Sequence, residues 1–355
     1  MKRILIMLAG IAACIAARAQ SADTVRLAFI GDVMSHHPQV TAALRTGADP
    51  AADSSYDYSD CFKYVRPFFN SADFVVANME FPVGVRPYTG YPQFSAPPAA
   101  AYETLRSGVD LFLAANNHIC DKGLAGMDST YTIYSRMGVP FTGFYRSEGE
   151  ELEKYPLTVS VKGIRIAIIN FTYGTNGLPV PAPYRVSTMD TASVRAAVER
   201  AREQKADYII AMPHWGEEYH LDFNASQKWW AEFLCQCGVD AIIGGHPHVV
   251  QAVESSPCPV TVWSLGNFVS NMSVPNAQIG MLFEMKLVRD DNGSVRAVDP
   301  EPTYLWCARK GMLEPNYVVL PIKDWIGRRD EFRVKEEYDK MEREWESVKR
   351  KFGIE

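Results

Sequence analysis

The sequence has 355 residues, which is enough for one large domain or two ordinary ones. Its 47% hydrophobic and 22% charged residues are typical of a globular protein and exclude a disordered chain. The net charge of -6 argues against a nucleic-acid partner. Beyond the N-terminus, no apolar run reaches the roughly 20 residues that a membrane-spanning helix needs.

The N-terminus has the pattern of a secretory signal peptide. Lys2 and Arg3 precede an apolar run that ends in small residues, and Ala17-Arg18-Ala19 forms an A-x-A cleavage site. We therefore predict a signal peptide over residues 1–19 and a periplasmic or secreted protein. The alternative is a lipoprotein anchored through Cys14. Removal of residues 1–19 leaves six cysteines, too few to form the framework of so large a fold, and the sequence does not assign disulfide pairs.

Strands alternate with helices along the first half of the chain. Apolar runs predict strands at 25–30, 73–77 and 110–114, and helices are expected at 38–45, 61–69, 99–107 and up to Met137. A long loop rich in Pro, Gly and Tyr spans residues 82–98. Loops of this kind frequently line functional sites.

The second half continues the alternation. A hairpin is predicted around Lys162-Gly163, and a second polar, Gly/Pro-rich loop covers 170–185. Further strands are predicted at 208–211, 241–243, 261–264 and, as an edge strand, 279–288, with helices at 191–205 and 225–237. Apolar residues spaced by four and three predict an amphipathic C-terminal helix within 321–355 that packs on a main domain at 20–320. The pattern indicates an α/β fold with a partly antiparallel sheet.

Polar residues that bind metals recur just past the ends of the predicted strands. In α/β sheets, ligand sites form outside the carboxyl ends of the strands, so these residues are expected to meet. Their carboxylate, carboxamide and imidazole groups suit one or two divalent ions such as Mn, Zn or Fe. They are Asp32, Asn78, Glu80, Asn116, Asn117, His118, His214, His246 and His248.

The order of these motifs resembles the calcineurin-like metallophosphatases, and more closely the CapA family of poly-γ-glutamate capsule synthesis proteins. The resemblance is carried by stretches between about residues 25 and 275, among them Gly31-Asp32, Asn117-His118, His214-Trp215-Gly216 and Gly245-His246-Pro247-His248. It implies a four-layer α/β/β/α sandwich. It also implies that Asp32, Glu80, Asn117, His214, His246 and His248 hold metal, with His118 as the acid.

Two positions depart from the metallophosphatase pattern. Met34 stands where those enzymes have a histidine, and a thioether is a poor ligand for a borderline dication, so His36 or His37 is a candidate substitute. Asn78-Met79-Glu80 replaces the usual aspartate motif, which makes the match of Glu80 to a bridging ligand looser. The number of metal ions, one or two, therefore stays open.

Several other polar and aromatic residues each have two possible roles. Asp121 either orients His118 or caps a helix. Trp215 and Tyr219 either line a substrate cleft or pack in the core, Asn267 holds a turn or faces the cleft, and Arg86 contacts an anionic substrate or is solvated. Asn78 and Asn116 are further candidates for substrate binding.

These observations predict an exported, CapA-like protein that acts in capsule or exopolymer synthesis through a metal-dependent hydrolase or transferase centre. The expected partners are an anionic polymer or phosphoester substrate and the capsule-synthesis machinery. The alternatives are a non-catalytic factor that binds or assembles the polymer, and a metallophosphoesterase or amidase unrelated to capsule.

Overall fold

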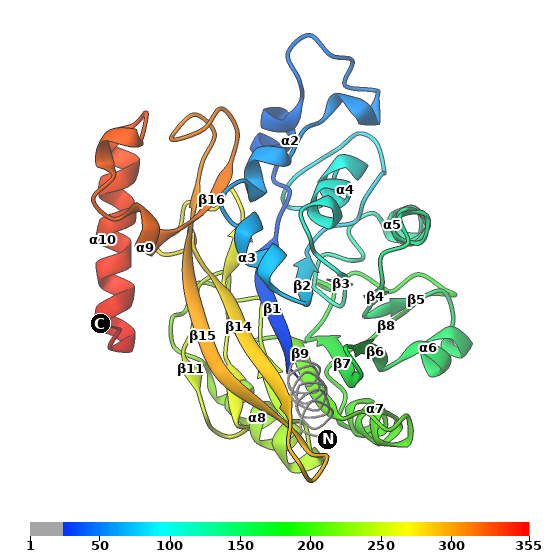
Figure 1. The fold of residues 1–355 in the computed structure, drawn as a ribbon. Coiled ribbons are helices and arrows are strands. Elements are labelled where there is room, and N and C mark those ends of the chain that lie inside the picture. Colours follow the sequence, from blue (N-terminus) through cyan, green and yellow to red (C-terminus); the bar gives the residue numbers. More distant parts are fainter. Residues whose placement is uncertain (1–23, 355) are drawn as a thin grey trace, which may run out of the picture.

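Two β-sheets form the centre of the molecule, which we describe from a computed structural model over residues 24–354 (Figure 1). The predicted signal peptide and Cys14 lie outside the described residues. The 8-stranded sheet has the order β16-β15-β14-β1-β2-β3-β4, with β13 paired to β1. Its strands are β1 (Thr24–Val33), β2 (Phe74–Met79), β3 (Leu111–Leu113), β4 (Phe141–Thr142), β13 (Asn267–Val269), β14 (Ile279–Arg289), β15 (Val295–Ala308) and β16 (Val318–Pro321).

The second sheet has six strands in the order β11-β12-β10-β9-β7-β6, and the hairpin predicted around Lys162-Gly163 is its antiparallel β6–β7 pair. A small separate pair joins β5 to β8. The strands are β5 (Phe144–Tyr145), β6 (Leu157–Val161), β7 (Ile164–Thr172), β8 (Arg185–Val186), β9 (Tyr208–His214), β10 (Ala241–Ile243), β11 (Val253–Glu254) and β12 (Val260–Val262).

The two sheets pack against each other, and helices cover their outer faces. Successive side chains of a strand point to opposite faces, so Leu27 and Phe29 of β1 join Ile168 and Ile210 in the core between the sheets. Ile30 instead joins the outer core that packs against the helices. The helices are α2 (His37–Ala43), α3 (Arg66–Ser71), α4 (Pro98–Arg106), α5 (Gly123–Met137), α6 (Glu148–Lys154), α7 (Thr191–Glu203), α8 (Ala225–Cys237), α9 (Ile322–Trp325) and α10 (Lys335–Phe352), with 3₁₀ turns η1 (Asp53–Ser55), η2 (Ser59–Phe62) and η3 (Arg329–Glu331).

This arrangement confirms the α/β/β/α sandwich. The outer core of the first sheet contains residues of α2 to α5, and that of the second sheet contains residues of α7 and α8. Within the first sheet β1, β2 and β3 run parallel, and within the second β7, β9, β10 and β12 run parallel. The carboxyl ends of these strands deliver the predicted polar residues to one side of the sandwich.

One predicted strand has a different place in the sheet. The segment at 279–288 was expected at an edge, but β14 pairs with both β1 and β15 and is therefore an interior strand. The expectation was wrong because the sequence pattern did not predict β15, a 14-residue strand that pairs with β14. Its charged residues and Pro302 break the apolar alternation, and its pairing with β14 shifts register between Glu284 and Lys286.

The C-terminal helix α10 packs on the first sheet from the face that also meets the second sheet, because its buried residues join the core between the sheets. Its apolar stripe of Tyr338, Met341, Trp345 and Val348 is buried, and the Trp345 ring lies 4.8 Å from the ring of Tyr304 on β15. Within residues 24–354, no helix combines the length and the apolar character that crossing a bilayer requires. All six cysteines of this part of the chain are free thiols.

Candidate metal centre

The loop after β10 carries His246 and His248. The strand is buried between β9 and β12, and the Gly244 amide donates to the Val262 carbonyl at 2.8 Å. A Cβ on Gly244 would lie 2.3 Å from the Trp263 carbonyl oxygen, so only glycine permits this approach. His246 and His248 then adopt positive φ angles of 98° and 59°, and both imidazoles are buried.

Glu80 lies between two overlapping sets of ligand atoms. One set is Glu80, His246 and His248, and the other is Asp32, Glu80 and His214, with the atoms of each set within 4.8 Å of one another. The Oε1 atom of Glu80 is 3.6 Å from Nε2 of His214 and 3.6 Å from Nε2 of His248. The geometry therefore makes Glu80 the carboxylate that both sets share.

Two buried polar atoms in these sets have no hydrogen-bond partner among the described residues: Oε1 of Glu80 and Nδ1 of His246. An unpaired buried polar atom is costly, and such atoms in native proteins frequently mark an ion or a functional group. Carboxylate and imidazole donors match the preference of borderline divalent metals. The residues present thus fit a divalent cation.

The charge balance of the centre depends on Asp32 and His248. Nδ1 of His248 lies 3.2 Å from Asp32, and Asn78 donates to the same carboxylate at 2.7 Å. Burial lowers the pKa of His248, but the carboxylates of Glu80 and Asp32 outweigh it and raise the pKa to about 9. Burial raises the pKa of Asp32, but the bond to His248 and its charge hold this pKa below its ordinary value.

The imidazole of His246 has the opposite protonation state from that of His248. Burial and the neighbouring His214 and His248 lower the pKa of His246 far below its usual range, so its ring is neutral. A neutral imidazole has a free lone pair, which is the form that ligates a metal.

Asn117 and His118 follow β3. Oδ1 of Asn117 lies 2.7 Å from Nε2 of His214, which places it at the edge of the centre. Nδ1 of His118 lies 2.8 Å from Asp121, and the same carboxylate oxygen accepts the Phe94 amide at 2.7 Å. Asp121 therefore orients His118, and it is not the cap of α5, whose N-cap residue is Lys122.

Three asparagines that were expected near the substrate are instead buried supports of the centre. Asn116 donates to Asn78 at 3.1 Å and accepts the His118 amide. Asn267 lies 3.0 Å from Nδ1 of His248 and donates to the carbonyl oxygen of the same residue. Asn78 donates to Asp32 and, at 3.3 Å, to Glu80. The polar atoms of these side chains are hydrogen-bonded to other residues of the protein. The three asparagines therefore position the candidate metal ligands.

Two other predicted substrate residues are not brought to the centre. Trp215 is buried in the outer core, and its indole donates to the Trp263 carbonyl at 3.0 Å. Arg86 pairs with Asp53 and lies over the Tyr88 ring. Tyr219 stays available, since it is partly exposed and its ring lies 6.1 Å from that of His248.

The substitutes considered for Met34 do not join either ligand set. Met34 itself is buried in the outer core. The backbone amide of His36 donates to Gln39 at 2.8 Å, Nδ1 of its ring accepts the Asn271 amide, and burial lowers the pKa of His36 to about 4. His37 is exposed and lines a neighbouring pocket.

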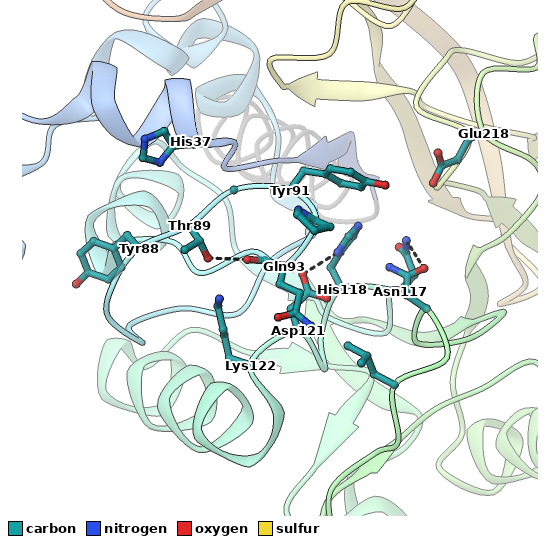
Figure 2. Close-up of a pocket in the computed structure, with 14 residues that line it drawn as sticks. His37, Tyr88, Thr89, Tyr91, Gln93, Asn117, His118, Asp121, Lys122 and Glu218 are labelled. Carbon is teal, nitrogen blue, oxygen red and sulfur yellow. Dashed lines mark hydrogen bonds and ion pairs between the residues drawn. The ribbon is translucent and has the colours of Figure 1, made fainter.

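That pocket has a volume of about 730 Å³ and opens beside His118 and Asn117 (Figure 2). One wall is the loop from Tyr88 to Gln93, and Glu218 lies across from it. Sequence reasoning did not assign Lys122 or Asn176, which also line it, nor Tyr173, whose ring lies 4.5 Å from that of His246. The signal for Asn176 and Tyr173 was the polar loop at 170–185, and no signal marked Lys122.

Comparison with known families identifies the chain. Residues 26–272 match the family model described as bacterial capsule synthesis protein PGA_cap. The chain belongs to this family. The predicted resemblance is thus confirmed, and the PGA_cap match includes every proposed metal ligand.

Two relatives are capsule proteins. The PGA biosynthesis protein CapA of Bacillus subtilis (strain 168) is 28% identical over 297 residues, which cover 81% of this chain and 74% of the relative. The capsule biosynthesis protein CapA of Bacillus anthracis is 25% identical over 291 residues, covering 78% and 67%.

A solved structure shares the fold. The putative 5'-nucleotidase from Staphylococcus aureus in complex with alpha-ketoglutarate superposes with a TM-score of 0.50 at 13% identity, covering 79% of this chain and 54% of the nucleotidase. This PGA_cap member therefore spans about half of that enzyme. At this identity the likeness shows the metallophosphatase fold alone.

Proposed function

We propose that this protein acts in the biosynthesis of a capsule polymer of the poly-γ-glutamate type, through a metal-dependent hydrolase or transferase centre. The observation that carries the proposal is Glu80. It is a fully buried carboxylate, it is shared by two sets of ligand atoms, and one of its oxygens has no partner among the described residues. The PGA_cap family and the two CapA relatives supply the biological process.

In this proposal, Asp32, Glu80, Asn117, His214, His246 and His248 hold one or two divalent ions. A bound ion would supply Lewis-acid polarisation of a phosphoryl or acyl oxygen. The chain's own residues supply the rest. Asp121 accepts a hydrogen bond from Nδ1 of His118 and so fixes the ring, which leaves Nε2 of His118 to give a proton to the leaving group.

The proposal includes export. The basic and apolar N-terminus predicts removal of residues 1–19, or lipidation of Cys14, before the protein reaches a capsule polymer outside the membrane. The mass of the mature protein isolated from the cell envelope distinguishes the two forms. A mature chain that keeps Met1 would contradict both.

Elemental analysis tests the centre. The purified protein is expected to contain about one or two Mn, Zn or Fe ions per chain, since each ligand set fits one ion. The double variant His246→Ala/His248→Ala is expected to contain none. Turnover is then screened on p-nitrophenyl phosphate, γ-glutamyl-p-nitroanilide and poly-γ-glutamate. Absence of metal in the wild type, even after incubation with Mn or Zn, would overturn the metal-dependent centre.

A second candidate function is a non-catalytic factor that binds the polymer. It is favoured by Met34, a buried thioether where metallophosphatases have a histidine ligand. It predicts that poly-γ-glutamate binds equally well to metal-free protein and that no substrate is turned over. Cleavage of phosphoesters without any interaction with the polymer would instead indicate an enzyme unrelated to capsule.

A further inference from the structure

A groove on the outer helices lies next to the pocket beside His118. It has a volume of about 890 Å³ and is bounded by α4, α5 and the segment from Arg45 to Tyr56. A second hollow of about 340 Å³ shares Arg45, Tyr56, Tyr102 and Arg106 with it. The two hollows therefore lie side by side, and we call them together the arginine groove.

Arg106 and Arg136 give the groove its charge. Arg106 is in the last turn of α4 and Arg136 in the last turn of α5, and both are exposed. The side chain of neither makes a hydrogen bond or an ion pair with any residue from 24 to 354. Cations at helix C-termini are favourable by themselves, but here two of them face one channel together with Arg45.

The acidic residues of the groove are already engaged. Asp53 accepts hydrogen bonds from Arg86 and Tyr88, and Asp128 accepts one from the Tyr184 hydroxyl at 2.6 Å. Arg45 is 3.2 Å from Asp57, so it is partly neutralised. Glu103, which also lines the groove, pairs with Arg66 at 2.5 Å. Asp128 keeps its charge, because a hydroxyl donor does not neutralise a carboxylate. Arg106 and Arg136 are thus the two lining cations that no ion pair compensates among the described residues.

One loop connects the groove to the pocket. Gly84 lines the groove, and Tyr88 to Gln93 line the pocket. A Cβ on Gly84 would lie 2.4 Å from the Ser129 hydroxyl oxygen of α5, so the loop lies directly against this helix. Lys122, at the start of α5, lines the pocket, as the view in Figure 2 shows.

The separation of the two sites sets the size of a ligand that reaches both. Lys122 and Arg136 are 14 positions apart along α5, which corresponds to about 21 Å at 1.5 Å per residue. No small molecule spans that distance, whereas an extended chain does. Repeated negative charges along such a chain would find Lys122 at one end and Arg106 and Arg136 at the other.

We propose that the arginine groove binds a second stretch of an anionic chain bearing repeated carboxylates, whose first stretch lies in the pocket beside His118. The proposal rests on the proposed function only for the class of ligand. The exposed Tyr102 side chain offers an apolar surface between the charged ends of the groove. Binding here holds a long chain in place independently of any reaction at the metal centre.

The test is equilibrium binding of labelled oligo-γ-glutamates of about 4 and about 20 residues, only the longer of which can extend over both sites. Protein treated with chelator is used, so a failure of the metal-dependent chemistry does not affect the result. The wild type is expected to bind the long oligomer at least about tenfold more tightly at low salt, where charge interactions are least screened. The variant Arg106→Gln/Arg136→Gln is expected to lose this gain and to bind the short oligomer as the wild type does.

The matched control is Arg343→Gln/Arg350→Gln on α10, which removes the same charge from the opposite side of the fold (Figure 1). It is expected to keep the gain for the long oligomer. Equal affinity of the wild type for both lengths, or an unchanged gain in Arg106→Gln/Arg136→Gln, would overturn the proposal. So would binding of inorganic polyphosphate alone, because the ligand class would then be wrong. A melting temperature within the wild-type range confirms that each variant is folded.

Discussion

The substitution Glu80→Gln separates the contribution of Glu80 to the fold from its contribution to metal binding. Glutamine keeps the shape of the side chain and removes the charge. In the metal-free protein above pH 9, His248 is neutral and Oε1 of Glu80 is buried without a partner. Removing that charge is therefore expected to raise the free energy of unfolding by about 1–3 kcal/mol. Near pH 7 the gain is smaller, because the attraction to protonated His248 is lost as well.

The effect on metal binding has the opposite sign. Loss of a supporting residue behind a ligand typically weakens metal affinity 10–100-fold, and loss of a shared ligand is expected to cost at least about 100-fold. At a metal concentration near 1,000 times the wild-type Kd, the metal stabilises the wild type by about 4.1 kcal/mol. The same concentration is only about 10 times the Kd of the variant, so the stabilisation falls to about 1.4 kcal/mol.

Urea unfolding with and without Mn or Zn measures both quantities. The matched control is Glu337→Gln, a buried glutamate that bonds to Gln278 and Trp306 away from the ligand sets. It is expected to change the stability of the metal-free protein and leave the stabilisation by metal intact. Equal stabilisation of Glu80→Gln and wild type by metal would refute the shared-ligand reasoning. A large loss of stability in metal-free Glu80→Gln above pH 9 would contradict the expected gain and show that Glu80 supports the fold through contacts other than the attraction to protonated His248.

Two further predictions concern the histidines. The pKa of His248 near 9 means that its contribution to the stability of the metal-free protein is complete below about pH 6.5 and is lost as pH rises through 9. Metal uptake at pH 7.5 is therefore expected to release about one proton from His248. Calorimetry in two buffers of different ionisation enthalpy detects this release, and identical heats would contradict it. Because His118 belongs to neither ligand set, His118→Ala is expected to keep its metal content and to lose about 10²–10⁴-fold in turnover. Loss of metal in this variant would instead make His118 a ligand.

The sequence predicted the layers, and it predicted that polar residues would gather at one side of the sandwich, because both rest on local patterns. Short apolar runs mark strands buried on both faces, and the polar residue after each run lies at a carboxyl end whatever the strand order. The parallel strands β1, β2, β9 and β10 fall into this class. The strand β15 does not, since its charged residues and Pro302 resemble a loop and only pairing with β14 makes it a strand.

The roles of the polar residues were harder to predict than their presence. Asn116, Asn267 and Trp215 have the side chains of a binding site, and nothing local to them reveals that each is buried. Whether such a residue contacts a substrate or supports a ligand depends on contacts such as that of Asn267 with His248, 19 positions away. The pairing of Asp121 with both His118 and Phe94 is of the same kind, since the Phe94 amide comes from a loop 27 positions earlier.

The backbone at the centre shows why these ligands are held so closely. His246 and His248 have φ angles of 98° and 59°, a region that side chains other than glycine rarely adopt and that costs about 1–3 kcal/mol per residue. Neighbouring contacts hold this backbone: the Pro247 carbonyl accepts the Tyr219 amide at 2.8 Å, and the His248 carbonyl accepts the Asn267 side-chain amide at 3.2 Å. Such strain persists only where the surrounding structure enforces it. Because glycine at either histidine position would relieve the strain, the fold carries these imidazoles at a cost in stability, and the proposed metal-binding role would account for that cost.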